Sequence, residues 1–67
     1  NGAALVVGRQ AQHIAVDVAN LSGQIVAQFE RENVAEGDRI ALELLPRGVY
    51  ALIVTIDGQR EILKLIR

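Results

Sequence analysis

The sequence predicts an all-β protein, an antiparallel sandwich of about six strands folded as one domain over residues 1–67. Apolar and polar residues alternate along several short segments, and turn-forming residues separate those segments roughly every ten positions. The chain is 51% hydrophobic but has one Phe, one Tyr and no Trp, so Val, Ile, Leu and Ala must build the core. Because such a short chain buries only about 60% of its unfolded surface, stability depends on how well these strands pack.

The first two predicted strands precede residue 20. Residues 4–7 are apolar and partly β-branched, and residues 8–12 form a polar break. Residues 13–19 then alternate, and a period of two over this length is typical of a half-buried strand. One face of that strand carries Ile14, Val16 and Val18.

A turn at residues 20–23 leads from the second strand into the third. Asn20 can bond its own backbone two residues on, and Gly23 can adopt a positive φ and form a bulge. Residues 24–30 follow as the returning strand of a hairpin. We expect one face of this strand to carry Ile25, Ala27 and Phe29.

Residues 31–39 are rich in charge and predict a solvated connection. Residues 40–44 alternate again and predict a fourth strand. Its inward side chains are expected to be Ile40, Leu42 and Leu44. Good helix formers also occur across residues 26–36 and 40–45, so a short helix in either segment stays open as an alternative.

The last third of the chain predicts a turn, a long central strand and a closing hairpin. The Pro within residues 45–48 lacks the amide donor that a central strand needs, so this segment turns. Residues 49–56 are the longest apolar run. Asp57 and Gly58 suit a type I′ turn, in which both central residues take positive φ, and residues 60–66 close the sheet.

Composition and charge argue against several function classes. The net charge is −1 and the seven cations are spread along the chain, so no nucleic acid partner is predicted. No apolar run reaches the roughly 18 residues of a membrane span. Without Cys, and with a single His, the chain predicts no disulfide, no metal site and no cofactor. Because the sequence starts at Asn1 rather than Met, we expect it to be a fragment of a longer protein.

Catalytic residues are not predicted either. His13 has no nucleophile placed against it, and Ser22 falls at a turn tip. The triplet at residues 20–22 matches an N-glycosylation acceptor, but the turn explains the same residues. Three carboxylates are expected on the solvated faces of alternating strands rather than as an acid–base pair, namely Asp17, Glu43 and Glu61.

The second face of the last two strands is more informative. If Tyr50, Leu52, Leu63 and Leu65 line the core, four apolar side chains face outward, namely Val49, Ile53, Ile62 and Ile66. A contiguous apolar patch on a small domain indicates a partner surface. An alternative that stays equally open is that the sandwich itself, or a second copy, covers both faces.

Three short motifs occur in order along the chain. They are Asn-Leu-Ser-Gly at residues 20–23, Leu-Pro-Arg-Gly-Val-Tyr at 45–50 and Lys-Leu-Ile-Arg at 64–67. In this order, with the last motif at the end, residues 20–67 resemble the C-terminal sorting domain of type IX secretion cargo, the type A domain of the Por secretion system. The Asn-Pro dipeptide that usually stands near the start of such domains is missing here.

The resemblance implies a small Ig-like antiparallel β-sandwich of about six to seven strands that acts as a non-catalytic address. It implies transit through the periplasm to the cell surface or the medium. The implied partners are the outer-membrane translocon, its shuttle proteins and a surface sortase that removes the domain and attaches the cargo to lipopolysaccharide. The implied recognition residues are Gly48, Val49, Tyr50, Lys64, Leu65, Ile66 and Arg67.

Two further expectations complete the functional interpretation. Strands that are apolar on both faces favour pairing of two copies into a homodimer through exposed strands. The alternative function is a generic Ig-like accessory or carbohydrate-binding module of a secreted protein. Sugar-binding platforms usually need exposed aromatic residues, and this chain has only two aromatic residues in all.

Overall fold

The computed structural model describes residues 4–42 and 45–67, and these residues form six strands in two antiparallel sheets. The strands are β1 (Ala4–Val6), β2 (Ala11–Ala19), β3 (Ile25–Val34), β4 (Arg39–Ala41), β5 (Val49–Ile56) and β6 (Gln59–Ile66). The predicted all-β antiparallel sandwich is confirmed. The alternative of a short helix is wrong, because the described residues contain none. The same residues accordingly include no helix long and apolar enough to cross a membrane.

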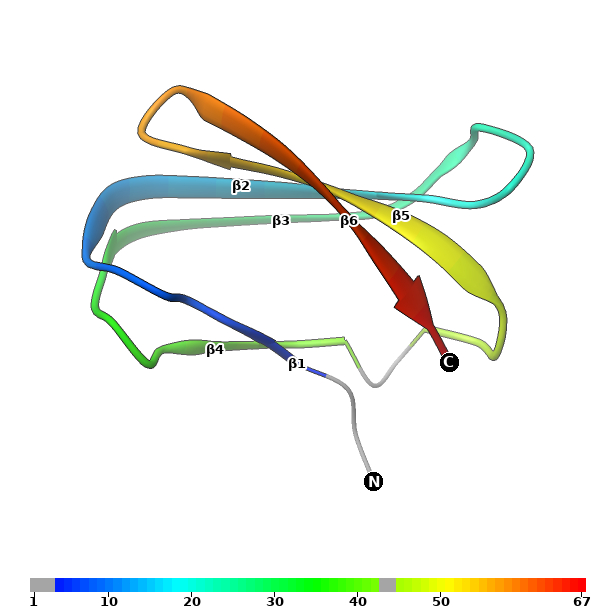
Figure 1. Cartoon of the computed structure of the whole chain (residues 1–67), viewed down its shortest axis with the longest axis horizontal. Helices are drawn as coiled ribbons and strands as arrows, with labels where there is room; N and C mark the ends of the chain where they lie inside the picture. Colours follow the sequence, from blue (N-terminus) through cyan, green and yellow to red (C-terminus); the bar gives the residue numbers. More distant parts are fainter. Residues whose placement is uncertain (1–3, 43–44) are drawn as a thin grey trace.

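Four strands form the larger sheet, in the order β3-β2-β5-β6, and β1 pairs with β4 in a separate two-stranded sheet. Figure 1 shows β1 and β4 running along one side of the larger sheet. The central strands are β2 and β5, and the edges are β3 and β6. The long apolar run predicted to be central is therefore β5, which pairs with β2 on one side and β6 on the other.

The core lies between the two sheets. Val16 of β2 lies opposite both Phe29 of β3 and Val54 of β5, so alternate side chains of these strands point to one face. Val16 is 0% exposed, and burying a side chain of this kind is worth about 1.5–3 kcal/mol. The buried cluster consists of Val7, Ala11, Ile14, Val16, Val18, Val34, Ile40, Leu42, Leu45, Tyr50, Leu52 and Val54.

The turn between β5 and β6 has the predicted conformation. Asp57 and Gly58 have φ values of 47° and 85°, as a type I′ turn requires. Asp57 also holds the start of β2, because its Oδ1 accepts the backbone N–H groups of Gln12 and His13, each at 3.0 Å. Its own N–H donates to the carbonyl of His13 at 3.0 Å. These bonds lie beside the start of β2, which begins at Ala11, two residues earlier than the alternation predicted.

The turn between β2 and β3 contains the predicted bulge, and the bulge changes which side chains face inward. Gly23 has a φ of 85°, and the pairing of β2 with β3 shifts register between Val18 and Ala19. Because one extra residue reverses the face of every side chain beyond it, Ile25 lies opposite Ala19 and is 48% exposed. The prediction that Ile25 shares one face with Ala27 and Phe29 is therefore wrong.

The third strand is longer than the sequence predicts. β3 continues to Val34, so the predicted solvated connection over residues 31–39 is wrong for its first four positions. These positions pair with the first residues of β2, and Arg31 lies opposite Ile14. Backbone pairing with β2 outweighs the charged composition, because an edge strand can leave charged side chains in water. Glu43 and Leu44, which belong to the predicted fourth strand, lie outside the described residues.

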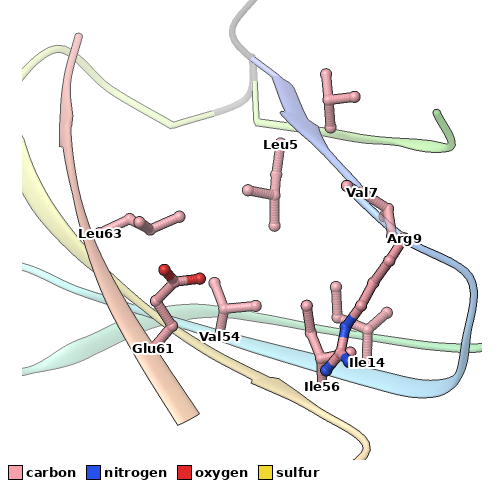
Figure 2. A pocket seen from close by; sticks show the side chains of 10 residues that line it. Leu5, Val7, Arg9, Ile14, Val54, Ile56, Glu61 and Leu63 are labelled. Atoms are coloured by element: carbon pink, nitrogen blue, oxygen red, sulfur yellow. The ribbon is translucent and has the colours of Figure 1, made fainter. Parts of the chain in front are cut away.

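The two-stranded sheet is narrower than the sheet it covers, and an open groove flanks it on each side. Figure 2 shows the groove beside β6, where Glu61 and Leu63 face Leu5 of β1. This groove has a volume of about 390 Å³. Glu61 lies opposite Val54 and in phase with Leu63, so it is not on a polar face as predicted, although it is solvated as predicted. It stays exposed because it stands at the rim of the covered area.

Candidate recognition site

The register of the last hairpin brings two of the three sequence motifs side by side. Val49 lies opposite Ile66, and Tyr50 lies opposite Leu65. One position further out, Gly48 and Arg67 exchange two backbone hydrogen bonds of 3.1 and 2.8 Å. The segment at residues 48–50 and the last four residues therefore form one continuous end of the larger sheet.

Side-chain bonds fasten this end to the preceding turn. Arg67 Nε donates to the carbonyl of Leu45 at 3.1 Å. Tyr50 is 7% exposed, and its hydroxyl donates to the carbonyl of Pro46 at 2.7 Å. The Tyr50 ring also lies against Gly48, where an added Cβ would stand 3.5 Å from the hydroxyl oxygen. An added methyl group at Gly48 would thus meet ordinary van der Waals contact rather than a clash.

The third motif lies at the same end. Asn20 Oδ1 accepts the backbone N–H groups of Ser22 and Gln24, each at 3.0 Å, which closes the turn that precedes β3. The tip residue Leu21 is 82% exposed. A groove of about 310 Å³ connects this turn to the last hairpin and is lined by Asn20, Leu21, Val49, Tyr50, Ala51, Ile62, Leu63 and Lys64. We call the residues 20–23, 48–50 and 64–67 the motif end.

The seven predicted recognition residues divide into three groups at the motif end. Lys64 is exposed and Ile66 is 69% exposed, and together with half-buried Val49 they point to the outer face of the sheet. Tyr50 and Leu65 point inward, toward the core. Gly48 and Arg67 form the backbone junction between the two motifs. The outward group lies on the surface of the sheet, and the inward group packs against the core.

The apolar patch predicted on the outer face is present. Ile53 lies opposite Ile62, and Val49 lies opposite Ile66, so the four predicted side chains form two apolar pairs on this face, with Ala51 and Lys64 between them. Ile62 is 65% exposed. Sequence reasoning missed Leu21, which extends this patch. The signal that could have found it is an apolar side chain at the tip of a turn, where nothing in the chain can cover it.

In the part of the chain that the structure describes, the side chains considered for catalysis do not assemble into a catalytic group. His13 Nε2 lies 2.7 Å from Glu30 Oε2 on the outer face, and both side chains are partly exposed. Asp17 Oδ1 accepts a bond from Gln28 at 3.1 Å. Among residues 4–42 and 45–67, no three His, Asp or Glu side chains are grouped so that they could hold a metal ion.

Neither aromatic side chain offers a platform for a sugar ring. Phe29 is half-buried and Tyr50 is buried. Since these are the only two aromatic residues of the chain, the geometry does not favour the carbohydrate-binding alternative. What the motif end provides is a contact surface of apolar and cationic groups.

One comparison with known proteins identifies a family. Residues 3–67 match the model of a family described as the secretion system C-terminal sorting domain. No curated protein and no solved structure shows significant similarity to the chain.

Proposed function

This chain belongs to the family of secretion system C-terminal sorting domains, and we propose that residues 1–67 are the address that routes an attached cargo through the type IX system. Domains of this family interact with the type IX machinery and direct export to the cell surface or the medium. The family consists of sorting signals rather than enzymes, and the proposal gives the domain no catalytic step.

The proposed route passes through the periplasm, where the domain folds on the end of its cargo. The outer-membrane translocon and its shuttle proteins then recognise the folded domain. At the cell surface a sortase removes the domain and attaches the cargo to lipopolysaccharide. This sequence of events assigns the domain a transient role in which it must be folded, exposed and separable from its cargo.

The observation that supports recognition of a folded surface is the meeting of three separate motifs at the motif end. Val49, Lys64, Ile66 and Arg67 make the contacts with the machinery. Gly48, Tyr50 and Leu65 keep that end in shape. Apolar side chains beside two cations suit a partner surface that is itself apolar with an acidic border.

A reporter fusion tests the proposed function. Residues 1–67 are attached to a periplasmic reporter in a bacterium with a working type IX system, and the reporter is followed in the periplasm, on the surface and in the medium. We expect export. If the fusion stays periplasmic while an established sorting domain exports the same reporter, the proposed function is wrong.

A charge variant tests the assigned contacts separately. Lys64→Ala with Arg67→Ala removes two cations from the motif end. Arg9→Ala with Arg39→Ala is the matched control, because it removes the same charge from exposed positions elsewhere. We expect export to fall only for the first pair, with both variants folded by circular dichroism. Lys64 is exposed, and losing the bond from Arg67 to the Leu45 carbonyl should cost only about 1 kcal/mol. Equal export of both pairs would remove Lys64 and Arg67 from the recognition residues.

A further inference from the structure

The two edge strands of the larger sheet carry opposite charges on the outer face. β6 presents the cations Arg60 and Lys64, whereas β3 presents the acids Glu30 and Glu32. Within the described residues, β6 pairs only with β5 and β3 pairs only with β2. Each strand therefore leaves one edge without a neighbouring strand, and the two edges differ in charge.

The inward side of the same strands shows the reverse pattern. β6 places Glu61 in phase with Leu63, and β3 places Arg31 in phase with Phe29. Four apolar side chains on these strands are only partly buried, although they pack against the core, namely Ala27, Phe29, Leu63 and Leu65. Another strand beside β6 or β3 would complete their burial.

The backbone groups at the two edges also match. In an antiparallel ladder, bonded residue pairs alternate with non-bonded pairs. Gly48 and Arg67 exchange both bonds, so alternate residues of β6, from Ile66 back to Arg60, turn their N–H and C=O groups away from β5. The Asp57 N–H donates to the His13 carbonyl, so His13 and every second residue after it in β2 turn their backbone groups toward β5. The residues between them bond to β3, and the backbone groups of Gln28, Glu30 and Glu32 therefore point away from β2, to the open edge of β3.

We propose that folded copies of this domain associate edge to edge, with β6 of one copy pairing antiparallel with β3 of the next. One register satisfies charge, apolar burial and backbone alternation together. It sets Glu32 opposite Arg60, Arg31 opposite Glu61, Phe29 opposite Leu63, Gln28 opposite Lys64 and Ala27 opposite Leu65. Opposite charges and apolar pairs at such positions stabilise neighbouring strands.

Charge separates this arrangement from a symmetric dimer. Residues directly opposite each other in an antiparallel pair lie on the same face. The charged side chains on the outer face of β6 are all cations, and the one on its inner face is Glu61. On β3 the charged side chains are acids on the outer face and Arg31 on the inner face. Pairing β6 with β6, or β3 with β3, can therefore set only like charges opposite each other. The association joins unlike edges, so each added copy presents a further edge and the assembly grows as a row.

Two charge reversals and their mixture test the proposal. Glu32→Arg and Arg60→Glu each set like charges opposite each other when a variant meets its own kind. We expect each variant alone to need about tenfold higher concentration than wild type to associate, from the strength of cross-strand charge pairs. An equimolar mixture of the two restores opposite charges at every junction, so we expect association to return toward the wild-type level.

Sedimentation velocity over micromolar to millimolar concentrations gives the readout, and circular dichroism checks that each variant is folded. Glu32→Gln with Arg60→Gln is a milder pair for the case in which a reversal unfolds the domain, and the two together should weaken association. The proposal is overturned by a strictly monomeric wild type, by unchanged association of the single variants, or by a mixture that behaves like its parts.

Disulfide trapping fixes the register, because the chain has no Cys of its own. A variant with Glu30→Cys and Ile62→Cys places two thiols opposite each other across the proposed junction. Under mild oxidation we expect a ladder of crosslinked copies. Ile62→Cys alone should give little crosslinking, and efficient dimers from that single substitution would show symmetric β6 pairing and overturn the proposal.

Discussion

At the scale of single residues, Asp57 and Tyr50 each do more than their sequence context indicates. Asp57 occupies the turn it was predicted to occupy, but its carboxylate also accepts two backbone N–H groups at the start of β2. Tyr50 was considered among the residues that line the core, and it is buried there, but its hydroxyl also donates to the Pro46 carbonyl in the adjoining turn. Asp57 thus connects two segments that are distant in the sequence, whereas Tyr50 fastens β5 to the turn that precedes it.

Replacing both residues of the β5–β6 turn should destabilise the domain strongly. Asp57→Val with Gly58→Val puts β-branched residues where φ is positive and removes the acceptor for Gln12 and His13. We expect a large fall in the midpoint of chemical denaturation. Gln59→Val, one position on, is the control and should change it little. An unchanged midpoint for the double variant would contradict the role of the turn.

Two substitutions at Tyr50 separate its ring from its hydroxyl. Tyr50→Phe removes only the bond to the Pro46 carbonyl and should cost about 1 kcal/mol of unfolding free energy. Tyr50→Ala empties a site that is 7% exposed and should cost on the order of 3 kcal/mol. Urea denaturation measures both. If Tyr50→Ala kept wild-type stability and lost only partner binding, Tyr50 would be a contact rather than an anchor.

At the scale of elements, β6 is the strand in which the core residues and the proposed recognition residues separate most clearly. Its inward residues Leu63 and Leu65 pack against the core. Its outward residues Ile62 and Ile66 are 65% and 69% exposed, with Lys64 between them. Because successive side chains of a strand point to opposite faces, the two roles can be altered independently.

Outward and inward substitutions in β6 should therefore have different effects. Ile62→Thr with Ile66→Thr keeps β-branched residues at exposed positions, so we expect stability within about 0.5 kcal/mol of wild type and reduced export of a fused reporter. Leu63→Thr with Leu65→Thr should lower stability and export together. Denaturation and export assays on the same fusions distinguish the two pairs. Wild-type export of the Ile62→Thr, Ile66→Thr variant would show that the export machinery does not bind the apolar patch.

The β2–β3 turn is the second element that joins fold to site. Asn20 Oδ1 accepts two backbone N–H groups at 3.0 Å, and Gly23 holds a φ of 85°. Together they position Leu21 at the motif end. The bulge beside this turn also sends Ile25 to the outer face.

Substitution of Asn20 should loosen this turn. Asn20→Ala leaves two exposed N–H groups without their side-chain acceptor, and we expect a loss of about 1 kcal/mol in unfolding free energy. Amide hydrogen exchange should speed up at Ser22 and Gln24 first. Gln10→Ala, at an exposed position outside the strands, serves as the comparison. Exchange rates at the turn that match wild type would contradict this role of Asn20.

At the scale of the whole molecule, a two-stranded sheet closes over a four-stranded one, and the buried cluster is small. A domain of this size rarely has more than about 3–5 kcal/mol of stability. One well-buried side chain is therefore a large share of the total. The half-buried apolar residues at both edges of the larger sheet contribute less to stability than full burial would, because the two-stranded sheet does not cover them completely.

Removing one central side chain should consequently unfold much of the population. Leu52 is 4% exposed at the centre of the core, and Leu52→Ala should cost on the order of 3 kcal/mol. We expect a poorly cooperative thermal transition by circular dichroism and loss of reporter export. Val6→Ala is the control, because Val6 is 54% exposed. A cooperative Leu52→Ala domain with wild-type melting temperature would contradict this view of the core.

Local chemistry was sufficient to predict much of this protein from its sequence. Alternation identified the central stretch of β2, the longest apolar run identified β5, and Asp57 with Gly58 identified the last turn, because these features depend on neighbouring residues alone. The ordered motifs identified the family, since they are a property of the chain itself. The separation of Val49, Ile53, Ile62 and Ile66 from the core also follows from a period of two.

Only the tertiary structure decided the rest, because it depends on contacts between distant segments. The bulge before β3 reversed the face of Ile25, and pairing with β2 extended β3 through charged residues. Which strands lie at the edges is a matter of sheet order, which no local pattern encodes. The meeting of three motifs at one end follows from the register of β5 with β6 and the packing of the β2–β3 turn beside them. Strand pairing is non-local, so its register becomes definite only when both strands share a core.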